Sequence, residues 1–323
     1  MTSKTTDSPP VEISVVIPAF NESQNILIIY QHLNDVLNST NEKWEIIFVD
    51  DGSTDDTWSQ VEELNSINKR VCGLRLSRNF GHQYALFAGL NAAHGAAIIS
   101  MDADLQHPPS VIPLLISEWR KGNKIVNTIR EDPVNLPFFK KVTSKIFYRM
   151  FSYLSGVKLE QGMADFRLID RQVLIQLLQF REEGLFLRGL VRWVGYPSSS
   201  ITFQCADRFS GASKYTTYKM LKFAWHGISS FSIVPLRIGI AIGVLTSLLS
   251  MYFLLDAIYA YIFLGTTVPG WTSTIGVISL LFGILFILLG LLGEYIGRIL
   301  VQVRGRPLYL VSNSLGIDKK TSQ

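Results

Sequence analysis

The stretch AAIISMDADLQHPP, residues 96–109, decides the fold class of this chain. Its first half, Ala96 to Met101, is a short apolar run of the kind found in strands that are buried on both faces. The run ends in two carboxylates spaced i, i+2, Asp102 and Asp104. Such a pair at a strand end can share one divalent ion, Mg²⁺ or Mn²⁺, whose other positions are filled by phosphate oxygens and water. A lone DxD is common by chance, so its meaning depends on its surroundings.

The same pattern, an apolar strand followed by a polar turn, occurs earlier in the chain. Strands are expected at 13–17, 45–49 and 71–76, with helices at 22–37, 54–65 and 83–93 between them. Because strands and helices alternate, we predict an open, mostly parallel α/β sheet with its functional loops at the carboxyl ends of the strands. Asn21-Glu22, Asp50-Asp51 and Asp102–Asp104 are expected to converge on that edge.

The end of the chain has a different composition. The 323 residues are 48% hydrophobic, which is too apolar for a soluble enzyme of this size, and most of the excess follows residue 232. Two spans of about 236–264 and 270–293 are each long enough to cross roughly 30 Å of hydrocarbon. Arginines flank the pair, and the connecting loop has no Lys or Arg, so the α/β domain and both termini are expected in the cytoplasm. Buried helices of a soluble core are the alternative.

Two basic segments rich in aromatic residues, 137–154 and 215–232, are expected to lie in the headgroup plane as amphipathic helices. Helices that cap the domain core are the alternative, and nucleic-acid binding is the weaker explanation of the basic residues. The predicted organisation is a disordered tail (1–10), a catalytic domain (11–214), a juxtamembrane helix (215–232), two transmembrane helices (233–297) and a cytoplasmic C-terminal tail (298–323).

The ordered set PAFNE (18–22), VDDGS (49–53), RNFGHQ (78–83), the DxD stretch and RFSGASKY (208–215) resembles the GT-A-fold family 2 glycosyltransferases. The resemblance covers about residues 11–310. Within that family it is greatest to the polyisoprenyl-phosphate glycosyltransferases, which include dolichol-phosphate mannose synthase and the GtrB type of bactoprenol glucosyltransferase. It implies a multi-pass enzyme of a bacterial inner membrane that inverts the anomeric centre, with Mg²⁺ or Mn²⁺ as cofactor.

The resemblance also implies roles for individual positions. Donor-binding positions are Pro18, Phe20, Glu22, Asp51, Asp102, Ala103 and Lys214. Metal-binding positions are Asp102, Asp104 and Gln106. Positions for the acceptor phosphate are Lys140, Ser144 and Arg208, and the catalytic positions are Asp165, Arg130 and Arg208.

Elementary chemistry supports several of these roles. Breaking the sugar–diphosphate bond builds negative charge, which a metal ion and arginines would stabilise. A phosphate monoester is mostly ionised near neutral pH, since its second pKa is near ~6, so the acceptor has little need of a general base. Asp165 is therefore expected to orient the acceptor or metal rather than to take a proton. A salt bridge to Arg167 or another nearby Arg is the alternative.

Two other functions compete with lipid glycosylation. A processive polysaccharide synthase would carry a QxxRW motif, and here Arg192-Trp193 is preceded by Gly189 at the Gln position. A catalytically idle membrane scaffold would have lost acidic or phosphate-binding positions, and none is lost. UDP-glucose is the expected donor, with aminoarabinose, GlcNAc and GDP-mannose donors open. The expected partners are the donor, undecaprenyl phosphate and the membrane, with no nucleic acid, and the resemblance implies a homotetramer.

Overall fold

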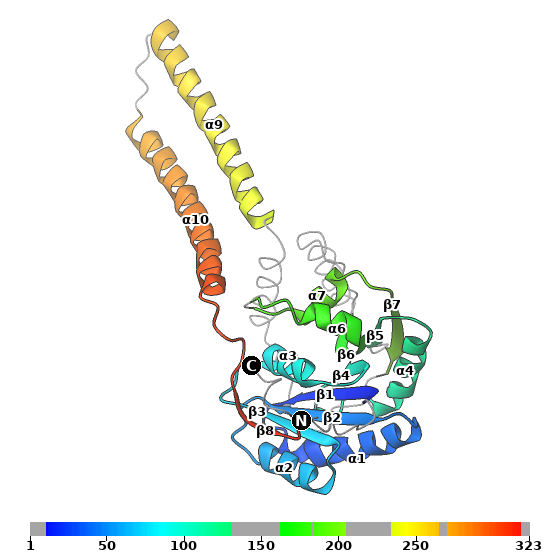
Figure 1. Cartoon of the computed structure of the whole chain (residues 1–323). Coiled ribbons are helices and arrows are strands. Elements are labelled where there is room, and N and C mark those ends of the chain that lie inside the picture. The colour runs from blue at the N-terminus through cyan, green and yellow to red at the C-terminus, as the bar shows by residue number, and fades with distance from the viewer. Residues whose placement is uncertain (1–10, 131–161, 183, 205–233, 265–269, 318–323) are drawn as a thin grey trace, which may run out of the picture. The chain divides into compact units, whose positions relative to one another are not determined.

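The computed structural model describes residues 11–130, 162–182, 184–204, 234–264 and 270–317 (Figure 1). They form two units. One unit contains the sheet and includes the residues from Pro307 onward. The other contains the two long helices and ends at Arg306. Each unit is described by itself.

Strands of the described residues form one sheet in the order β7-β5-β6-β4-β1-β2-β3-β8. Strands β4, β1, β2 and β3 run parallel, as predicted, while β6 is antiparallel to β4 and β5, and β8 is antiparallel to β3. The bounds are Ile13–Ala19 for β1, Trp44–Asp50 for β2, Val71–Leu76 for β3, Ala97–Ser100 for β4, Ile125–Arg130 for β5, Met163–Asp170 for β6, Ser198–Phe203 for β7 and Val311–Leu315 for β8.

Helices cover both faces of the sheet, with α1 and α2 on one side and α3 on the other (Figure 1). The predicted helical spacing in α1 is confirmed, since Ile26, Ile29, Leu33 and Leu37 are all buried. The bounds in this unit are Ser23–Ser39 for α1, Thr57–Ile67 for α2, His82–Ala92 for α3, Pro109–Val111 for the 3₁₀ helix η1, Ile112–Arg120 for α4, Arg171–Leu177 for α6 and Leu187–Trp193 for α7.

The loops that follow β1 and β2 are fastened to each other. The Asn21 backbone N–H donates to Ser53 Oγ at 2.9 Å, and the Asn21 side-chain oxygen accepts from the Thr54 N–H at 2.9 Å. Asp55 accepts both from the Thr57 N–H at the start of α2 and from the Ser23 N–H at the start of α1. Because capping carboxylates satisfy exposed N–H groups at helix N-termini, this network fixes the two loops as one surface.

Gly52 is required for this packing. Its φ of +72° is a left-handed conformation, and a Cβ at this position would lie 2.5 Å from the carbonyl carbon of Arg78. We expect Gly52→Ala to destabilise the fold by roughly 1–2 kcal/mol for the backbone conformation alone, and by more once the clash is added. Gly122→Ala is the matched control, because Gly122 has φ +101° and no described atom lies within 4 Å of its added Cβ. Thermal unfolding of the purified variants measures the difference, and equal losses would contradict a clash at Gly52.

The prediction that residues 298–323 form a C-terminal tail is wrong in two respects. Helix α10 continues to Val303, and residues Val311–Leu315 form β8 at the edge of the sheet. The Ser77 N–H donates to the Leu310 carbonyl, and the Tyr309 hydroxyl accepts from the Asn91 amide at 3.1 Å. This region therefore belongs to the same unit as the sheet.

The second unit contains helices α9, Val234–Leu264, and α10, Trp271–Val303. They contact each other where a Cβ on Gly239 would lie 2.7 Å from the Leu288 side chain. Among the described residues, Leu280–Val303 is the one segment that is long and apolar enough to cross a membrane, and Gly239–Phe253 is a shorter apolar stretch. Two helices exist where two spans were predicted, and the crossing of the membrane by both stays a prediction. The amphipathic segments 137–154 and 215–232 lie outside the described residues.

Candidate active site

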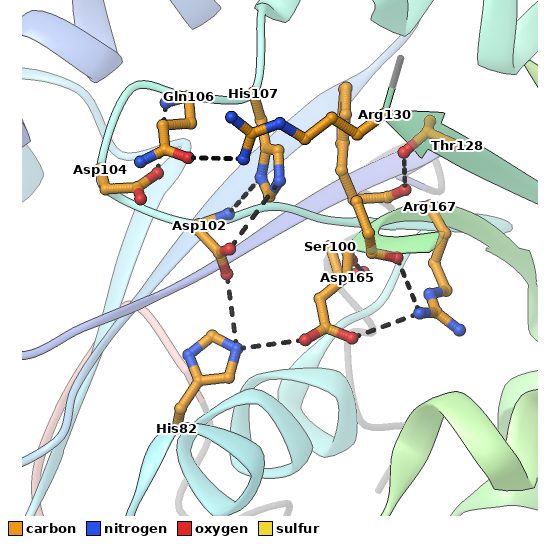
Figure 2. A network of polar contacts seen from close by, with 12 residues as sticks. His82, Ser100, Asp102, Asp104, Gln106, His107, Thr128, Arg130, Asp165 and Arg167 are labelled. Atoms are coloured by element: carbon orange, nitrogen blue, oxygen red, sulfur yellow. Dashed lines mark hydrogen bonds and ion pairs between the residues drawn. The ribbon is translucent and has the colours of Figure 1, made fainter. Parts of the chain in front are cut away.

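The two DxD carboxylates follow β4 on a tightly folded loop. Asp104 Oδ1 accepts from the Gln106 backbone N–H at 3.2 Å, and the intervening Leu105 has a φ of +61°. The Gln106 side-chain oxygen accepts from Arg130 Nη1 at 3.3 Å, at the end of β5 (Figure 2). The structure thus brings Asp104, Gln106 and Arg130 together, although Arg130 is distant in sequence.

Asp165 lies on β6, beside this loop. Because β6 is antiparallel to β4, its beginning lies at the edge of the sheet where β4 ends. The carboxylate is 5% exposed and forms a two-point ion pair with Arg188, whose Nε and Nη2 each lie 2.8 Å from a carboxylate oxygen. Arg167 Nη2 donates to Oδ1 at 3.2 Å and Gln83 Nε2 donates to Oδ2 at 3.4 Å. The Asp165 carboxylate is therefore surrounded by donors.

These donors determine the charge of Asp165. Burial raises the pKa of this carboxyl, but the Arg188 charge, the nearby His82 ring and the Arg167 charge outweigh it and hold the pKa well below its usual range. An acid with so low a pKa stays ionised near neutral pH and is a poor proton acceptor. Of the interpretations made from the sequence, the ion pair to a nearby Arg has the geometric support.

His82, the first residue of α3, connects the two acidic positions. Its Nε2 lies 3.4 Å from Asp102 Oδ1 and 3.7 Å from Asp165 Oδ2 (Figure 2). Burial lowers the pKa of His82, but the nearby carboxylates of Asp165 and Asp102 outweigh it and raise the pKa above the ordinary value. Burial also raises the pKa of Asp102, against the opposing charges of the two neighbouring histidines. A cation near Asp102 would favour its ionised form.

The positions expected to hold the nucleoside lie at the carboxyl ends of β1 and β2. Pro18 and Ala19 pair in register with Val49 and Asp50, which places the PAFNE and VDDGS turns side by side. Phe20 is 43% exposed, and Glu22 Oε2 accepts from the Asn25 amide at 2.6 Å.

Asp51 has a different environment from the one its expected role suggests. It is buried, and its two oxygens accept from the backbone N–H groups of Phe80 and Gly81 at 2.8 and 2.9 Å. Burial raises its pKa, and these two bonds only partly oppose that effect. Asp51 therefore holds the RNFGHQ loop in place in this structure, and direct contact with a nucleoside stays a prediction.

Four predicted site residues lie outside the described residues: Lys140, Ser144, Arg208 and Lys214. The structure consequently places the metal positions, Arg130, Asp165 and the donor positions other than Lys214, but not the positions predicted to hold the acceptor phosphate.

Arg188 was missed by reasoning from the sequence. It lies in LRGLVRW, where the Arg192-Trp193 pair was weighed but Arg188 was not. No spacing rule connects it with Asp165, 23 residues earlier. Gln83 on α3 links the same two segments, donating to Asp165 and accepting at 3.3 Å from the N–H of Leu187, the residue before Arg188. A basic residue in the first turn of a helix, after Gly184, was the only local signal.

Comparison with known proteins assigns the family. Residues 14–178 match the family model for glycosyl transferase family 2, and a Bacillus subtilis protein described as the uncharacterized glycosyltransferase YkcC is 40% identical over 96% of each chain. This chain belongs to glycosyltransferase family 2. The SfII prophage-derived bactoprenol glucosyl transferase of Shigella flexneri is 36% identical over 94% of this chain and 98% of that relative. A solved mannosyl-3-phosphoglycerate synthase from Rubrobacter xylanophilus gives a TM-score of 0.46 with 14% identity, covering 68% of this chain and 72% of that one.

The acidic loop of this glycosyltransferase can be tested for its fit to a metal ion. Among the described residues, no three His, Cys, Asp or Glu side chains are grouped to hold a metal by themselves. Two carboxylates and an amide oxygen nevertheless suit Mg²⁺ or Mn²⁺, which commonly take one or two protein carboxylates and fill the remaining positions with phosphate oxygens and water. The Gln106 side-chain oxygen already accepts from Arg130, and a carbonyl oxygen has two lone pairs, so it could join them while it keeps that hydrogen bond. The donor set fits a metal ion that protein and substrate hold jointly.

Proposed function

We propose that this glycosyltransferase transfers one sugar, glucose from UDP-glucose as the expected donor, onto a polyisoprenyl phosphate with inversion at the anomeric carbon. The observation that carries the proposal is the convergence of Asp102, Asp104 and the Asp165–Arg188 pair at the carboxyl end of β4. The acceptor class is supported by relatives of nearly full-length coverage that are named bactoprenol glucosyl transferases, at 36–37% identity.

Asp102 and Asp104 would hold Mg²⁺ or Mn²⁺ against the donor diphosphate, with Gln106 as a further ligand. A bound divalent ion supplies positive charge where the departing diphosphate becomes more negative. Arg130 adds charge on the same side, because its guanidinium already lies against Gln106. Arg208, by resemblance, would do the same, and the planar donor fork of arginine suits phosphate oxygens.

The acceptor attacks through a phosphate oxygen that is already ionised near neutral pH, so no residue needs to remove a proton. This agrees with the low pKa of Asp165. In the proposed mechanism Asp165 is an anchor: it fixes Arg188 and His82 at the edge of the reacting region. Lys140, Ser144 and Arg208 are proposed to bind the acceptor phosphate, and Pro18, Phe20, Glu22, Asp51, Ala103 and Lys214 the donor.

The membrane assignments belong to the same proposal. Helices α9 and α10 would both cross a bacterial inner membrane, with the sheet domain on the cytoplasmic side and segments 137–154 and 215–232 at the headgroups. Homotetramer formation is proposed by resemblance. Such an arrangement would give the catalytic domain access to a lipid phosphate without extracting the lipid chain from the bilayer.

The donor and the product type can be tested together. Detergent-purified protein would be incubated with polyisoprenyl phosphate and, in turn, radiolabelled UDP-glucose, UDP-GlcNAc, UDP-aminoarabinose and GDP-mannose. We expect label in the organic phase, as a lipid carrying one sugar, with one of these donors. A water-soluble polymer would support the processive synthase instead, and absence of a lipid-linked sugar with every donor would overturn the proposal.

A further inference from the structure

His107 lies in the DxD stretch, directly after Gln106, and has no role in the proposed mechanism. Its ring is buried, and its Nδ1 accepts from the backbone N–H of Asp102 at 3.0 Å. Its Nε2 lies 3.8 Å from Asp102 Oδ2 (Figure 2). One imidazole therefore contacts both the backbone and the carboxylate of the first DxD aspartate.

The hydrogen bond from Asp102 assigns the tautomer. An acceptor nitrogen carries no proton, so Nδ1 is bare and the ring proton of the neutral imidazole lies on Nε2. This places the Nε2–H group on the side of the Asp102 carboxylate. The ring orientation thus defines both where the loop backbone runs and which way the carboxylate can turn.

The ring itself is held by aromatic packing. It stacks on Phe166 with centroids 5.2 Å apart and an interplanar angle of 19°, and it meets the edge of Phe203 at 6.0 Å. Phe166 lies on β6 next to Asp165, so the same strand positions the ring and the anchor carboxylate. Pro108 follows directly, and a residue before proline is confined to extended conformations, which restricts the His107 backbone as well.

The loop needs such a restraint. Leu105 has a φ of +61°, an unfavourable conformation for a residue with a branched side chain, and strained backbone persists only where its surroundings determine it. The contact from His107 back to Asp102 closes the loop around Leu105. Without this contact, the loop would lose the backbone conformation that sets the spacing of the two carboxylates.

We propose that His107 is a positioning residue that holds Asp102, through its backbone N–H, in the orientation that binds the divalent ion. This inference rests on the proposed metal site and adds a residue that is not itself a ligand. Outer-shell partners of metal ligands typically change metal affinity by about 10-fold or more when they are removed.

Three substitutions separate hydrogen bonding from packing. His107→Asn keeps an acceptor near the Nδ1 position but loses the ring. His107→Phe keeps a ring that can stack on Phe166 but has no acceptor. His107→Gln is the matched polar control, since its longer amide reaches the Nε2 position rather than the Nδ1 position.

The measurement is Mn²⁺ binding to the full-length protein in the presence of UDP or GDP. Binding is detected as the loss of the EPR signal of free Mn²⁺, and thermal unfolding is measured in parallel. We expect His107→Asn to bind Mn²⁺ within about 3-fold of wild type, and His107→Phe and His107→Gln to bind about 10-fold more weakly. If one of the two weak binders fails to fold, the other still gives the comparison with Asn.

A purely structural role predicts the reverse order, with Phe best and Asn worst. The proposal is overturned if Phe or Gln binds Mn²⁺ as wild type does, if Asn is no better than Gln, or if the wild type binds no Mn²⁺ with either nucleotide. None of these measurements uses the lipid acceptor. A failure of lipid glycosylation would therefore leave this result unaffected, and the two failures can be told apart.

Discussion

Asp104→Ala is expected to lower sugar transfer by roughly 10³-fold or more, because the carboxylate would hold the cation that stabilises the leaving diphosphate. Asp104→Asn should lose nearly as much, since it keeps the side-chain volume but removes the negative charge. The measurement is the initial rate of lipid-linked sugar formation at saturating donor, combined with Mn²⁺ binding by EPR. Both readouts should fall together if the effect comes from the metal.

A matched control for this prediction is Asp35→Asn. Asp35 is an exposed acid in the C-terminal half of α1, so the substitution changes the net charge as Asp104→Asn does without touching the loop after β4. It should transfer sugar at the wild-type rate. Full activity of membranes carrying Asp104→Ala would show that the metal assignment is wrong.

The second large effect concerns the Asp165–Arg188 pair. Arg188→Ala removes a two-point ion pair whose bonds are both 2.8 Å, and Asp165→Asn removes the charge that faces Arg188 and Arg167. If Asp165 anchors Arg188, each variant should lose about 10²-fold in kcat/KM. The kcat/KM of the double variant should then lie within ~3-fold of that of the less active single variant. Arg188→Lys should recover only part of the activity, because a lysine cannot make the two-point contact.

A general-base role for Asp165 predicts a different pattern. Asp165→Asn would then be far more damaging than Arg188→Ala, and the rate would fall as Asp165 became protonated. The low pKa of Asp165 in the folded protein means that the ion pair is intact at neutral pH and is lost only as the pH falls through that low value. We therefore expect no fall in kcat between about pH 8 and pH 5 that depends on Asp165, so wild type and Asp165→Asn should have profiles of the same shape in this range. Such a fall would contradict the anchor role.

Much of the sheet could be predicted because its central strands are buried on both faces. Continuous apolar runs located β1, β2, β3 and β4 to within two residues. Their parallel direction followed from the helices between them, while their order in the sheet was not predicted. Strand β6 was missed because its sequence MADFRLID is neither a continuous apolar run nor a regular alternation: the buried side chains of Asp165 and Arg167 interrupt it. Strand β8 pairs with β3 although they are far apart in the chain, and such contacts leave no local pattern.

The site divides in the same way. Asp102, Asp104 and Asp165 could be predicted as site residues because carboxylates near the carboxyl edge of the sheet carry a chemical signature and a family resemblance. The Asp165–Arg188 pair and the contact of His107 with Asp102 could not be predicted, because they depend on which side chains the fold brings together. Arg188 reaches Asp165 from a separate helix, and His107 contacts Asp102 across a loop in which Leu105 adopts a left-handed backbone conformation.

The most direct test of the central claim is a stoichiometric transfer assay with purified protein, undecaprenyl phosphate and the donor selected from the panel. We predict that one nucleoside diphosphate is released for each lipid that gains one sugar, that omitting the lipid phosphate stops both, and that EDTA stops both until Mg²⁺ or Mn²⁺ is restored. Sugar transfer that proceeds without the lipid phosphate, or a product that carries a growing chain of sugars, would contradict the account.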